Sequence, residues 1–166
     1  MHLAEHYFGA TQNCAASIFL RIHHYTGASV IIGGEILLNN SYNLGEIGHI
    51  QIDPLGERYH CGNFGCLETI VANSTIENRI RQQLEQNYPS QLKANNCSIK
   101  AIYSAENKNN PLAIEVIKHV GHHLGKAIAI IIINLFNPPK VVIDGEITAA
   151  EKVLYPPCKT ASKHKH

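Results

Sequence analysis

Residues 45–68 read GEIGHIQIDPLGERYHCGNFGCLE, and this stretch of the 166-residue chain holds the side chains that are most informative about function. Its side chains include two carboxylates and an imidazole near two thiols: Glu46, His49, Cys61, Cys66 and Glu68. Such a group predicts a polar pocket, held in shape by a metal ion or by a tight loop. We therefore expect the rest of the chain to act as a scaffold around this stretch.

The composition is that of a folded domain. Hydrophobic residues make up 45% of the chain and charged residues 16%, with a formal net charge of +1. This leaves enough apolar surface to bury a core, and it provides no broad field that would attract nucleic acid or a membrane. DNA binding by these residues themselves is therefore not indicated.

Location and redox state are predicted from the N-terminus and the cysteines. Residues 1–9, MHLAEHYFG, lack the basic and apolar regions of a signal peptide, so we expect a cytoplasmic protein. The longest apolar run, residues 127–133, is too short to span a bilayer. The five cysteines are odd in number and irregularly spaced, which favours reduced thiols with a metal pair over a disulfide framework.

The first third of the chain predicts a helix and a small sheet. Residues 3–8 have a helical pattern that ends at Gly9. Residues 17–23, 28–32 and 35–38 are strand-like, with a Gly33-Gly34 turn between the last two. We therefore expect a three-stranded antiparallel unit. The short turn at residues 25–27 also offers backbone N–H groups to a phosphate, although a single glycine there is usually structural.

Helices dominate the second half of the predicted fold. Ser74 and Glu77 match a capping box at the start of a helix over residues 75–86, and residues 86–97 are polar and predict a loop. A short helix is expected over residues 99–105. Asn110 and Pro111 are typical of a helix start, and an apolar stripe then continues to residue 136: Leu112, Val116, Val120, Leu124, Ile128 and Leu135.

The end of this long helix predicts deep burial. Residues 127–133, AIAIIII, are apolar on all sides, so we expect them to be buried between a sheet and another helix. Residues 140–143 then predict a buried strand, followed by an Asp144-Gly145 turn. A helical pattern begins at Thr148 and is broken by Pro156-Pro157. We expect residues 156–166 to be disordered and the chain to be incomplete at this end.

Several blocks in this order resemble the ROK family of repressors, open reading frames and sugar kinases. GEIGH at residues 45–49 and CGNFGCLE at residues 61–68 are similar to the family signature; matching blocks elsewhere are LAEHYFG, NLFNP and DGEIT. The resemblance spans residues 3–154 and is strongest toward the family's repressors of N-acetylglucosamine metabolism. It implies the α/β class and a partial actin-like, hexokinase-like ATPase fold, namely the C-terminal lobe.

The same resemblance implies a sugar-binding site. The family places its sugar-contacting groups at the Glu and His of its GExGH motif and at the Glu of its CLE motif, which correspond to Glu46, His49 and Glu68. The chemistry agrees, because carboxylates accept paired hydrogen bonds from adjacent sugar hydroxyls, each contributing about 1.5–3 kcal/mol. We expect these three residues to bind the inducer.

The family's zinc site is expected to be incomplete. Its pattern, H-x9-C-x-C-x4-C, corresponds here to His49, Cys61 and Cys66, with Tyr59 in place of the first Cys. Structural zinc is almost always four-coordinate with nitrogen and sulfur ligands, and a neutral phenol is a poor substitute for a thiolate. Three alternatives stay open: His60 supplies the fourth ligand, water fills it, or the loop holds no metal.

Together, the resemblance implies that residues 1–155 form much of the effector-binding and dimerisation lobe of a ROK transcriptional repressor of amino-sugar metabolism. The intact parent would sense an amino-sugar phosphate inducer, N-acetylglucosamine 6-phosphate. We expect homo-oligomers, no membrane contact, and DNA contact only through a winged helix-turn-helix that these residues lack. Residues 156–166 would be a divergent tail.

Two other functions remain as alternatives. The first is a truncated ROK sugar or amino-sugar kinase without activity. The sequence shows neither a DxGxT-type phosphate turn nor an Asn-Asp pair before residues 3–9, so we expect no enzyme activity. The second alternative is a stand-alone, zinc-dependent module for sugar binding or dimerisation. The neighbouring coding sequence would distinguish a repressor from a kinase.

Overall fold

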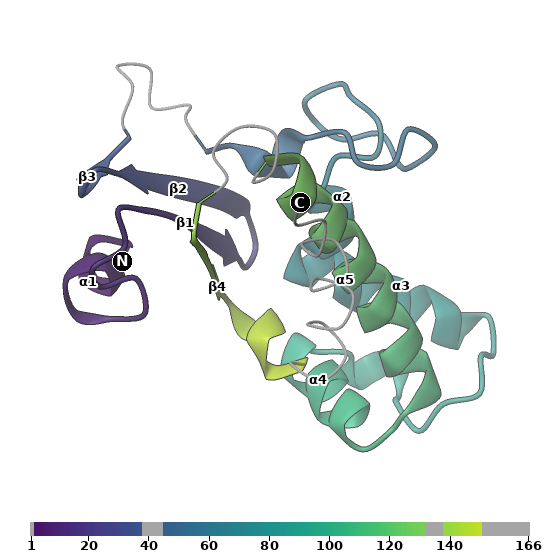
Figure 1. Cartoon of the computed structure of the whole chain (residues 1–166). Coiled ribbons are helices and arrows are strands. Elements are labelled where there is room, and N and C mark those ends of the chain that lie inside the picture. Colours follow the sequence, from purple (N-terminus) through teal and green to yellow (C-terminus); the bar gives the residue numbers. More distant parts are fainter. Residues whose placement is uncertain (1, 38–44, 132–137, 151–166) are drawn as a thin grey trace.

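The computed structural model describes residues 2–37, 45–131 and 138–150. Its centre is a four-stranded mixed sheet in the order β3-β2-β1-β4 (Figure 1). The strands are β1 (Ala16–Ile22), β2 (Thr26–Ile32), β3 (Glu35–Ile36) and β4 (Lys140–Asp144). The first three strands pair antiparallel, and β4 runs parallel to β1. The predicted antiparallel unit and the α/β class are therefore confirmed.

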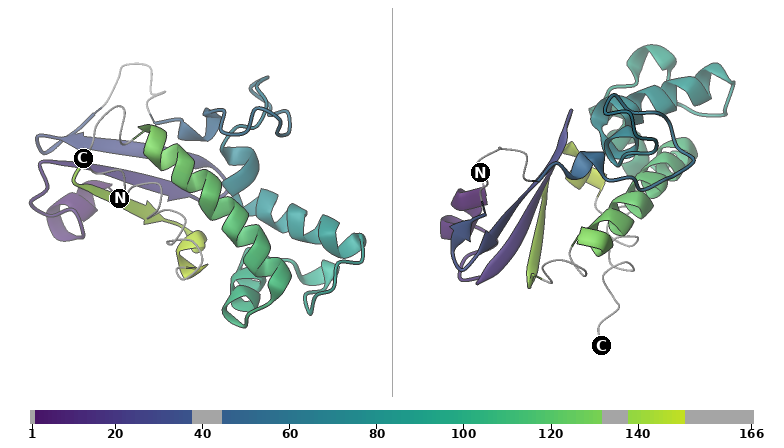
Figure 2. Two further views of the ribbon diagram at one scale, coloured as in Figure 1. Left: turned by 45° about the vertical axis from the view of Figure 1, so that its right-hand side comes forward. Right: turned by 90° about the horizontal axis from the view of Figure 1, so that it is seen from above.

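Helices cover both faces of this sheet. Helix α1 (His2–Phe8) lies on one side, and α2 (Glu68–Val71), α3 (Asn73–Glu85), α4 (Ile99–Asn107) and α5 (Pro111–Ile131) lie on the other (Figure 2). The imidazole of His2 fixes α1 to the sheet through the hydroxyls of Ser29, at 2.7 Å, and Ser17, at 3.0 Å. No helix within the described ranges is long and apolar enough to cross a membrane.

The alternation of strand β1 places its apolar side chains in the main core. Ile18, Leu20 and Ile22 are fully buried and join one hydrophobic cluster with helix α5. Because successive side chains of a strand point to opposite faces, Ser17 and Phe19 lie on the α1 side. Gly33 and Gly34 adopt φ values of +61° and +86°, which permits the predicted tight turn between β2 and β3.

Helix α5 has the predicted apolar stripe. Its core contacts come from side chains spaced at helical period, all buried: Leu112, Val116, Val120, Leu124 and Ile128. In its second half Ala127 and Ile128 are buried, as expected, whereas Ile130 is 44% exposed, so one side of the helix faces solvent there. Leu135 and the predicted end of the helix lie outside the described residues.

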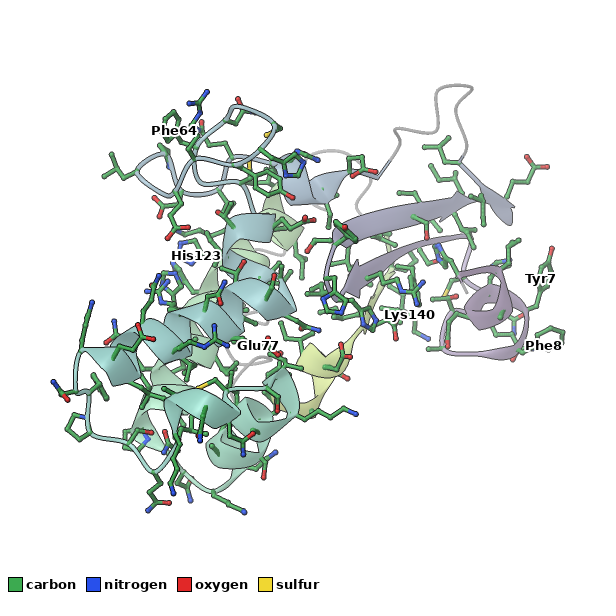
Figure 3. The ribbon with its side chains drawn as sticks, turned by 180° about the vertical axis from the view of Figure 1, so that it is seen from behind. Tyr7, Phe8, Phe64, Glu77, His123 and Lys140 are labelled. Atoms are coloured by element: carbon green, nitrogen blue, oxygen red, sulfur yellow. The ribbon has the colours of Figure 1, made fainter. Side chains whose placement is uncertain are left out.

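One of the two predicted helix caps is confirmed. The side chain of Asn110 accepts a hydrogen bond from the backbone N–H of Ala113 at 3.1 Å, as expected for the start of α5. The capping box predicted for α3 is wrong, because that helix begins at Asn73 and Ser74 lies within it. Glu77 instead accepts a hydrogen bond from the N–H of Ile99 at 2.7 Å, so it caps α4. Glu77 lies between these helices in Figure 3.

Shorter elements complete the described chain. The 3-10 turns are η1 (Ile47–His49), η2 (Ala94–Asn96), which lies within the predicted loop, and η4 (Glu146–Ala150). Strand β4 forms where predicted, but it is half-buried rather than buried because it lies at the edge of the described sheet. The tail at residues 156–166 lies outside the described residues.

Candidate functional site

The three predicted inducer-binding residues gather around the 3-10 turn η1. Glu46 immediately precedes this turn, and its carboxylate makes no capping hydrogen bond. His49 ends the turn, with its Nε2 atom 3.9 Å from Oε2 of Glu46. Glu68, the first residue of α2, packs against the middle of the same turn. Glu46 and His49 are accessible, with side chains 63% and 36% exposed.

Glu68 is the buried charge of this site, only 8% exposed. Its Oε2 atom accepts a hydrogen bond from the backbone N–H of Thr26 at 2.6 Å, and its Oε1 atom accepts one from the hydroxyl of Tyr59. A buried carboxylate needs such donors, since an unpaired charge away from water is costly. The backbone N–H of Thr26, in the turn considered above for phosphate binding, therefore donates to the carboxylate of Glu68.

Gly48 makes this arrangement possible. A Cβ atom on Gly48 would lie 2.6 Å from Oε2 of Glu68 and 2.9 Å from the backbone oxygen of Thr26. Both distances are too short for carbon, so only glycine lets the turn η1 approach the carboxylate this closely. Gly48 thus fixes the position of Glu68 relative to Glu46 and His49.

The pKa of His49 is raised by its surroundings. The largest cause is a hydrogen bond with the thiol of Cys61, and the carboxylates of Glu46 and Glu68 add to it. Conversely, the same hydrogen bond lowers the pKa of Cys61. Burial, followed by the hydrogen bond to Glu68, raises the pKa of Tyr59, so its hydroxyl keeps its proton and acts as a donor.

Glu68 and Tyr59 line a cavity of about 660 Å³, a size suited to a small-molecule ligand. The other lining residues come from the turn after β1, the loop before α2, α2 itself and the start of α3: His24, Tyr25, Glu57, Arg58, His60, Thr69, Ala72, Ser74 and Thr75. Among the described residues, Glu46 and His49 do not line this cavity. The structure thus brings the three predicted residues to one turn but places only Glu68 in the hollow.

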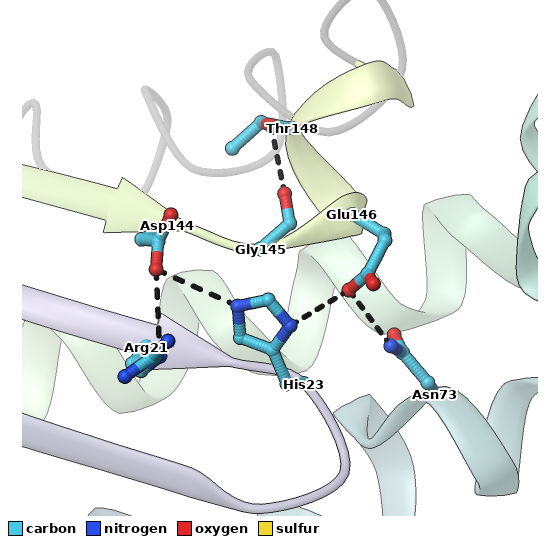
Figure 4. Close-up of polar contacts among 7 residues, drawn as sticks. All are labelled: Arg21, His23, Asn73, Asp144, Gly145, Glu146 and Thr148. Carbon is cyan, nitrogen blue, oxygen red and sulfur yellow. Dashed lines mark hydrogen bonds and ion pairs between the residues drawn. The ribbon is translucent and has the colours of Figure 1, made fainter.

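A polar network beside this cavity was not predicted from the sequence. At the ends of β1 and β4, His23 contacts Oδ2 of Asp144 at 3.5 Å through Nε2 and Oε2 of Glu146 at 2.9 Å through Nδ1 (Figure 4). Arg21 also pairs with Asp144 at 3.5 Å, and Asn73 donates to Glu146 at 2.9 Å. The network joins the sheet to α3, and it fixes the turn that supplies the N–H group of Thr26.

The donors present do not fit a closed zinc site. The thiols of Cys61 and Cys66 lie 3.6 Å apart, and Cys61 is hydrogen-bonded to His49, so three of the four family positions are together. Tyr59, at the fourth position, turns its hydroxyl to Glu68 instead. Burial also raises the pKa of Cys66 to about 11. Within the described ranges, no group of three or more His, Cys, Asp or Glu side chains is arranged to hold a metal ion.

The mixed sheet with helices on both faces corresponds to part of an actin-like ATPase fold. The ROK family model matches residues 1–164, and the chain therefore belongs to the ROK family. The family resemblance and the fold expected from it are confirmed.

Known relatives include both regulators and enzymes. The chain is 60% identical over 154 residues to the DNA-binding transcriptional dual regulator NagC of Escherichia coli (strain K12), covering 93% of this chain and 38% of NagC. A solved ROK family transcriptional regulator, a homologue of the E. coli Mlc protein, is 43% identical with a TM-score of 0.91, covering 96% of this chain and 40% of that one. The glucokinase of Halalkalibacterium halodurans is 31% identical, covering 95% of this chain and 49% of the enzyme.

In sequence, the chain is therefore more similar to the ROK transcriptional repressors of sugar metabolism than to the kinases. The chain spans about two fifths of the length of the regulators it matches.

Proposed function

We propose that the chain is the effector-binding part of a ROK transcriptional repressor of amino-sugar metabolism, with residues 1–155 as much of the effector-binding and dimerisation lobe. The observation that carries this proposal is Glu68, a nearly buried carboxylate at the wall of a ligand-sized cavity. A buried charge is costly unless it is paired, and such groups concentrate at functional sites. The 60% identity to NagC supports N-acetylglucosamine 6-phosphate as the inducer of the intact protein.

The chemistry of the site suits a polyhydroxylated ring. Glu68 would accept hydrogen bonds from sugar hydroxyls inside the cavity, and Glu46 and His49, at the ends of the turn η1 outside the cavity lining, would contact a ligand that extends beyond it. Carboxylates accept from adjacent hydroxyls in pairs, which distinguishes sugars from less hydroxylated metabolites. Arg58, His24 and His60 also line the cavity and would face a negatively charged ligand group.

Regulation would follow from a shift in conformational equilibrium. An inducer can move a repressor away from its operator only if it binds the non-DNA-binding state more tightly. In this proposal the present chain contributes the inducer site and contacts with a second copy, in the cytoplasm. DNA contact would belong to another part of the intact protein.

We also propose that the chain has no kinase activity of its own. Phosphoryl transfer to a sugar needs a base beside the accepting hydroxyl and a site for the nucleotide phosphates. The two Asp residues of the chain, Asp53 and Asp144, do not line the cavity. Of the two glutamates that do, Glu68 is already bonded to Thr26 and Tyr59, and Glu57 is exposed. ATP-dependent phosphorylation of glucose, N-acetylglucosamine or N-acetylmannosamine by the purified chain would contradict this proposal.

A thermal-shift screen tests the proposed ligand class. N-acetylglucosamine 6-phosphate, N-acetylglucosamine, glucose and inorganic phosphate are each titrated against the 166-residue chain. A ligand that binds only the folded state raises the Tm as its concentration exceeds the Kd. We expect the amino-sugar phosphate to raise the Tm most. Equal effects of inorganic phosphate and the sugar phosphate would show that no sugar is recognised.

A further inference from the structure

Both oxygens of Glu68 are already occupied by donors of the chain itself. Oε2 faces inward, between the N–H of Thr26 and the backbone of Gly48. Oε1 accepts from the hydroxyl of Tyr59, and Tyr59 and Glu68 both line the cavity. The oxygen available to a cavity ligand is therefore Oε1, and the phenol holds the position where a ligand hydroxyl would donate.

Tyr59 belongs to an exposed hairpin that lies outside the hydrophobic core. Tyr59 and Asn63 are joined by a backbone hydrogen bond of 2.7 Å, and Gly62, with φ of +92°, closes the turn between them. Phe64, after the tip, is 49% exposed and projects at the outer end of this loop (Figure 3). The base of the loop is fixed separately, through hydrogen bonds from the N–H groups of Ile52 and Asp53 to the backbone oxygen of Gly65, at 2.8 and 3.1 Å.

A phenol is well matched to compete with a sugar. The phenol and each sugar hydroxyl offer one neutral O–H donor, and both gain from donating to an ionised oxygen. The phenol has the advantage of being tethered, because its contact with Glu68 is intramolecular and carries no cost of association. A ligand gains over it only when several of its groups bind at once.

We propose that Tyr59 is a built-in competitor for Glu68, which a polyhydroxylated ligand must displace in order to bind. This inference rests on the proposed function, because it assumes that the cavity takes a sugar. Tyr59 thereby sets the affinity threshold of the site. At a given concentration, only a ligand whose other contacts supply enough affinity, such as a charged group against Arg58, would then occupy the site.

The test compares ligand affinity in two tyrosine variants by isothermal titration with N-acetylglucosamine 6-phosphate and with glucose. Tyr59→Phe removes the competing hydroxyl and keeps the ring. Tyr7→Phe is the matched control, since Tyr7 is 56% exposed, does not line the cavity and makes no described hydrogen bond through its hydroxyl. We expect Tyr59→Phe to tighten binding about tenfold or more, the equivalent of one hydrogen bond to a charged group. The control should match wild type.

The possible failures are distinguishable. Unchanged affinity in a folded Tyr59→Phe chain, with binding still weakened by Glu68→Gln, would overturn the role of Tyr59 as a competitor and leave the proposed function intact. Weaker binding by Tyr59→Phe would overturn it too, since the hydroxyl would then contact the ligand. No binding by wild type or by Tyr59→Phe would contradict both proposals. Thermal melting of each variant confirms folding, and Tyr59→Ala, which also clears the ring, should bind at least as tightly as wild type.

Discussion

Gly48 lies so close to Glu68 that a methyl group on its Cα atom would sit 2.6 Å from Oε2 of that carboxylate. The contact joins the GEIGH and CLE blocks, which are separated by nearly 20 residues of sequence. It explains why a glycine stands between the two polar residues of the first block, and it makes the geometry of the site sensitive to a single carbon atom.

We therefore expect Gly48→Ala to weaken ligand binding and to destabilise the fold. The added carbon would meet a charged oxygen and the backbone oxygen of Thr26, so main-chain atoms must shift, at a cost of about 1–3 kcal/mol. Gly27→Ala is the matched control, because its Cβ atom would meet nothing nearer than 3.7 Å. Urea unfolding and ligand titration measure both effects. Equal behaviour of the two variants would contradict the role assigned to Gly48.

The cap of α5 gives a second prediction. Asn110→Ala removes the acceptor for the N–H of Ala113 and the contacts with Ser90, so we expect a loss of about 1–2 kcal/mol in the free energy of unfolding. Ser98→Ala should cost less, since the side chain of Ser98 accepts from the N–H of Ala101 at a longer 3.4 Å. Chemical denaturation of both variants measures the difference. A larger loss for Ser98→Ala would refute this ranking.

Stability should also depend on the protonation of His119. Burial, and then the charge of Arg79, lower the pKa of His119 to about 4. An unfolded histidine has a pKa near ~6.5, so the unfolded chain binds a proton that the folded chain refuses. The contribution of His119 is therefore fully present above about pH 6.5 and is lost as the pH falls toward 4.

The measurement is the free energy of unfolding between pH 7.5 and about pH 4.5, the range in which the contribution of His119 to stability changes most. His119→Gln should flatten the loss of stability on acidification, and His24→Gln, at an exposed imidazole without a described partner, should leave it unchanged. A wild-type slope in His119→Gln would show that other groups cause the acid sensitivity.

Metal content tests whether Tyr59, in place of the first Cys of the family's pattern, prevents zinc binding. With Tyr59 turned to Glu68, we expect the wild-type chain to retain little or no zinc, and Tyr59→Cys to bind one zinc ion tightly, since a fourth soft ligand completes the tetrahedron. Tyr59→Ala controls for loss of the ring. Metal analysis that found one tightly held zinc in wild type, unchanged in Tyr59→Cys, would mean that His60 or another group already completes the site.

Features that repeat along the chain were predictable. The stripe from Leu112 to Ile128 has helical period, and Gly33-Gly34 marks a tight turn, so α5 and the β2–β3 hairpin follow from local rules. The family motifs indicated Glu46, His49 and Glu68 as the sugar-binding residues, and that role stays a prediction. In each case the residues that form the feature are neighbours in the sequence or belong to one recognisable motif.

Features that depend on distant partners were not predictable. Glu77 matched a local capping pattern, yet it caps the next helix, 22 residues away, because α3 begins earlier than Ser74. The bond from His23 to Asp144 spans 121 residues, and nothing near either residue signals it. Tyr59 appeared only as a missing zinc ligand, because its contact with Glu68 arises when the loop folds back over the start of α2.

The most direct test of the central proposal is an isothermal titration of N-acetylglucosamine 6-phosphate into wild type, Glu68→Gln and Glu57→Gln. Both variants remove one negative charge from the same cavity, but only Glu68 is nearly buried and bonded to Thr26. We expect Glu68→Gln to weaken binding by about 10- to 100-fold, as for loss of hydrogen bonds to a charged acceptor, and Glu57→Gln to bind within about threefold of wild type. Wild-type affinity in Glu68→Gln, with its fold intact by thermal melting, would contradict the assignment of this carboxylate as the sugar-binding group.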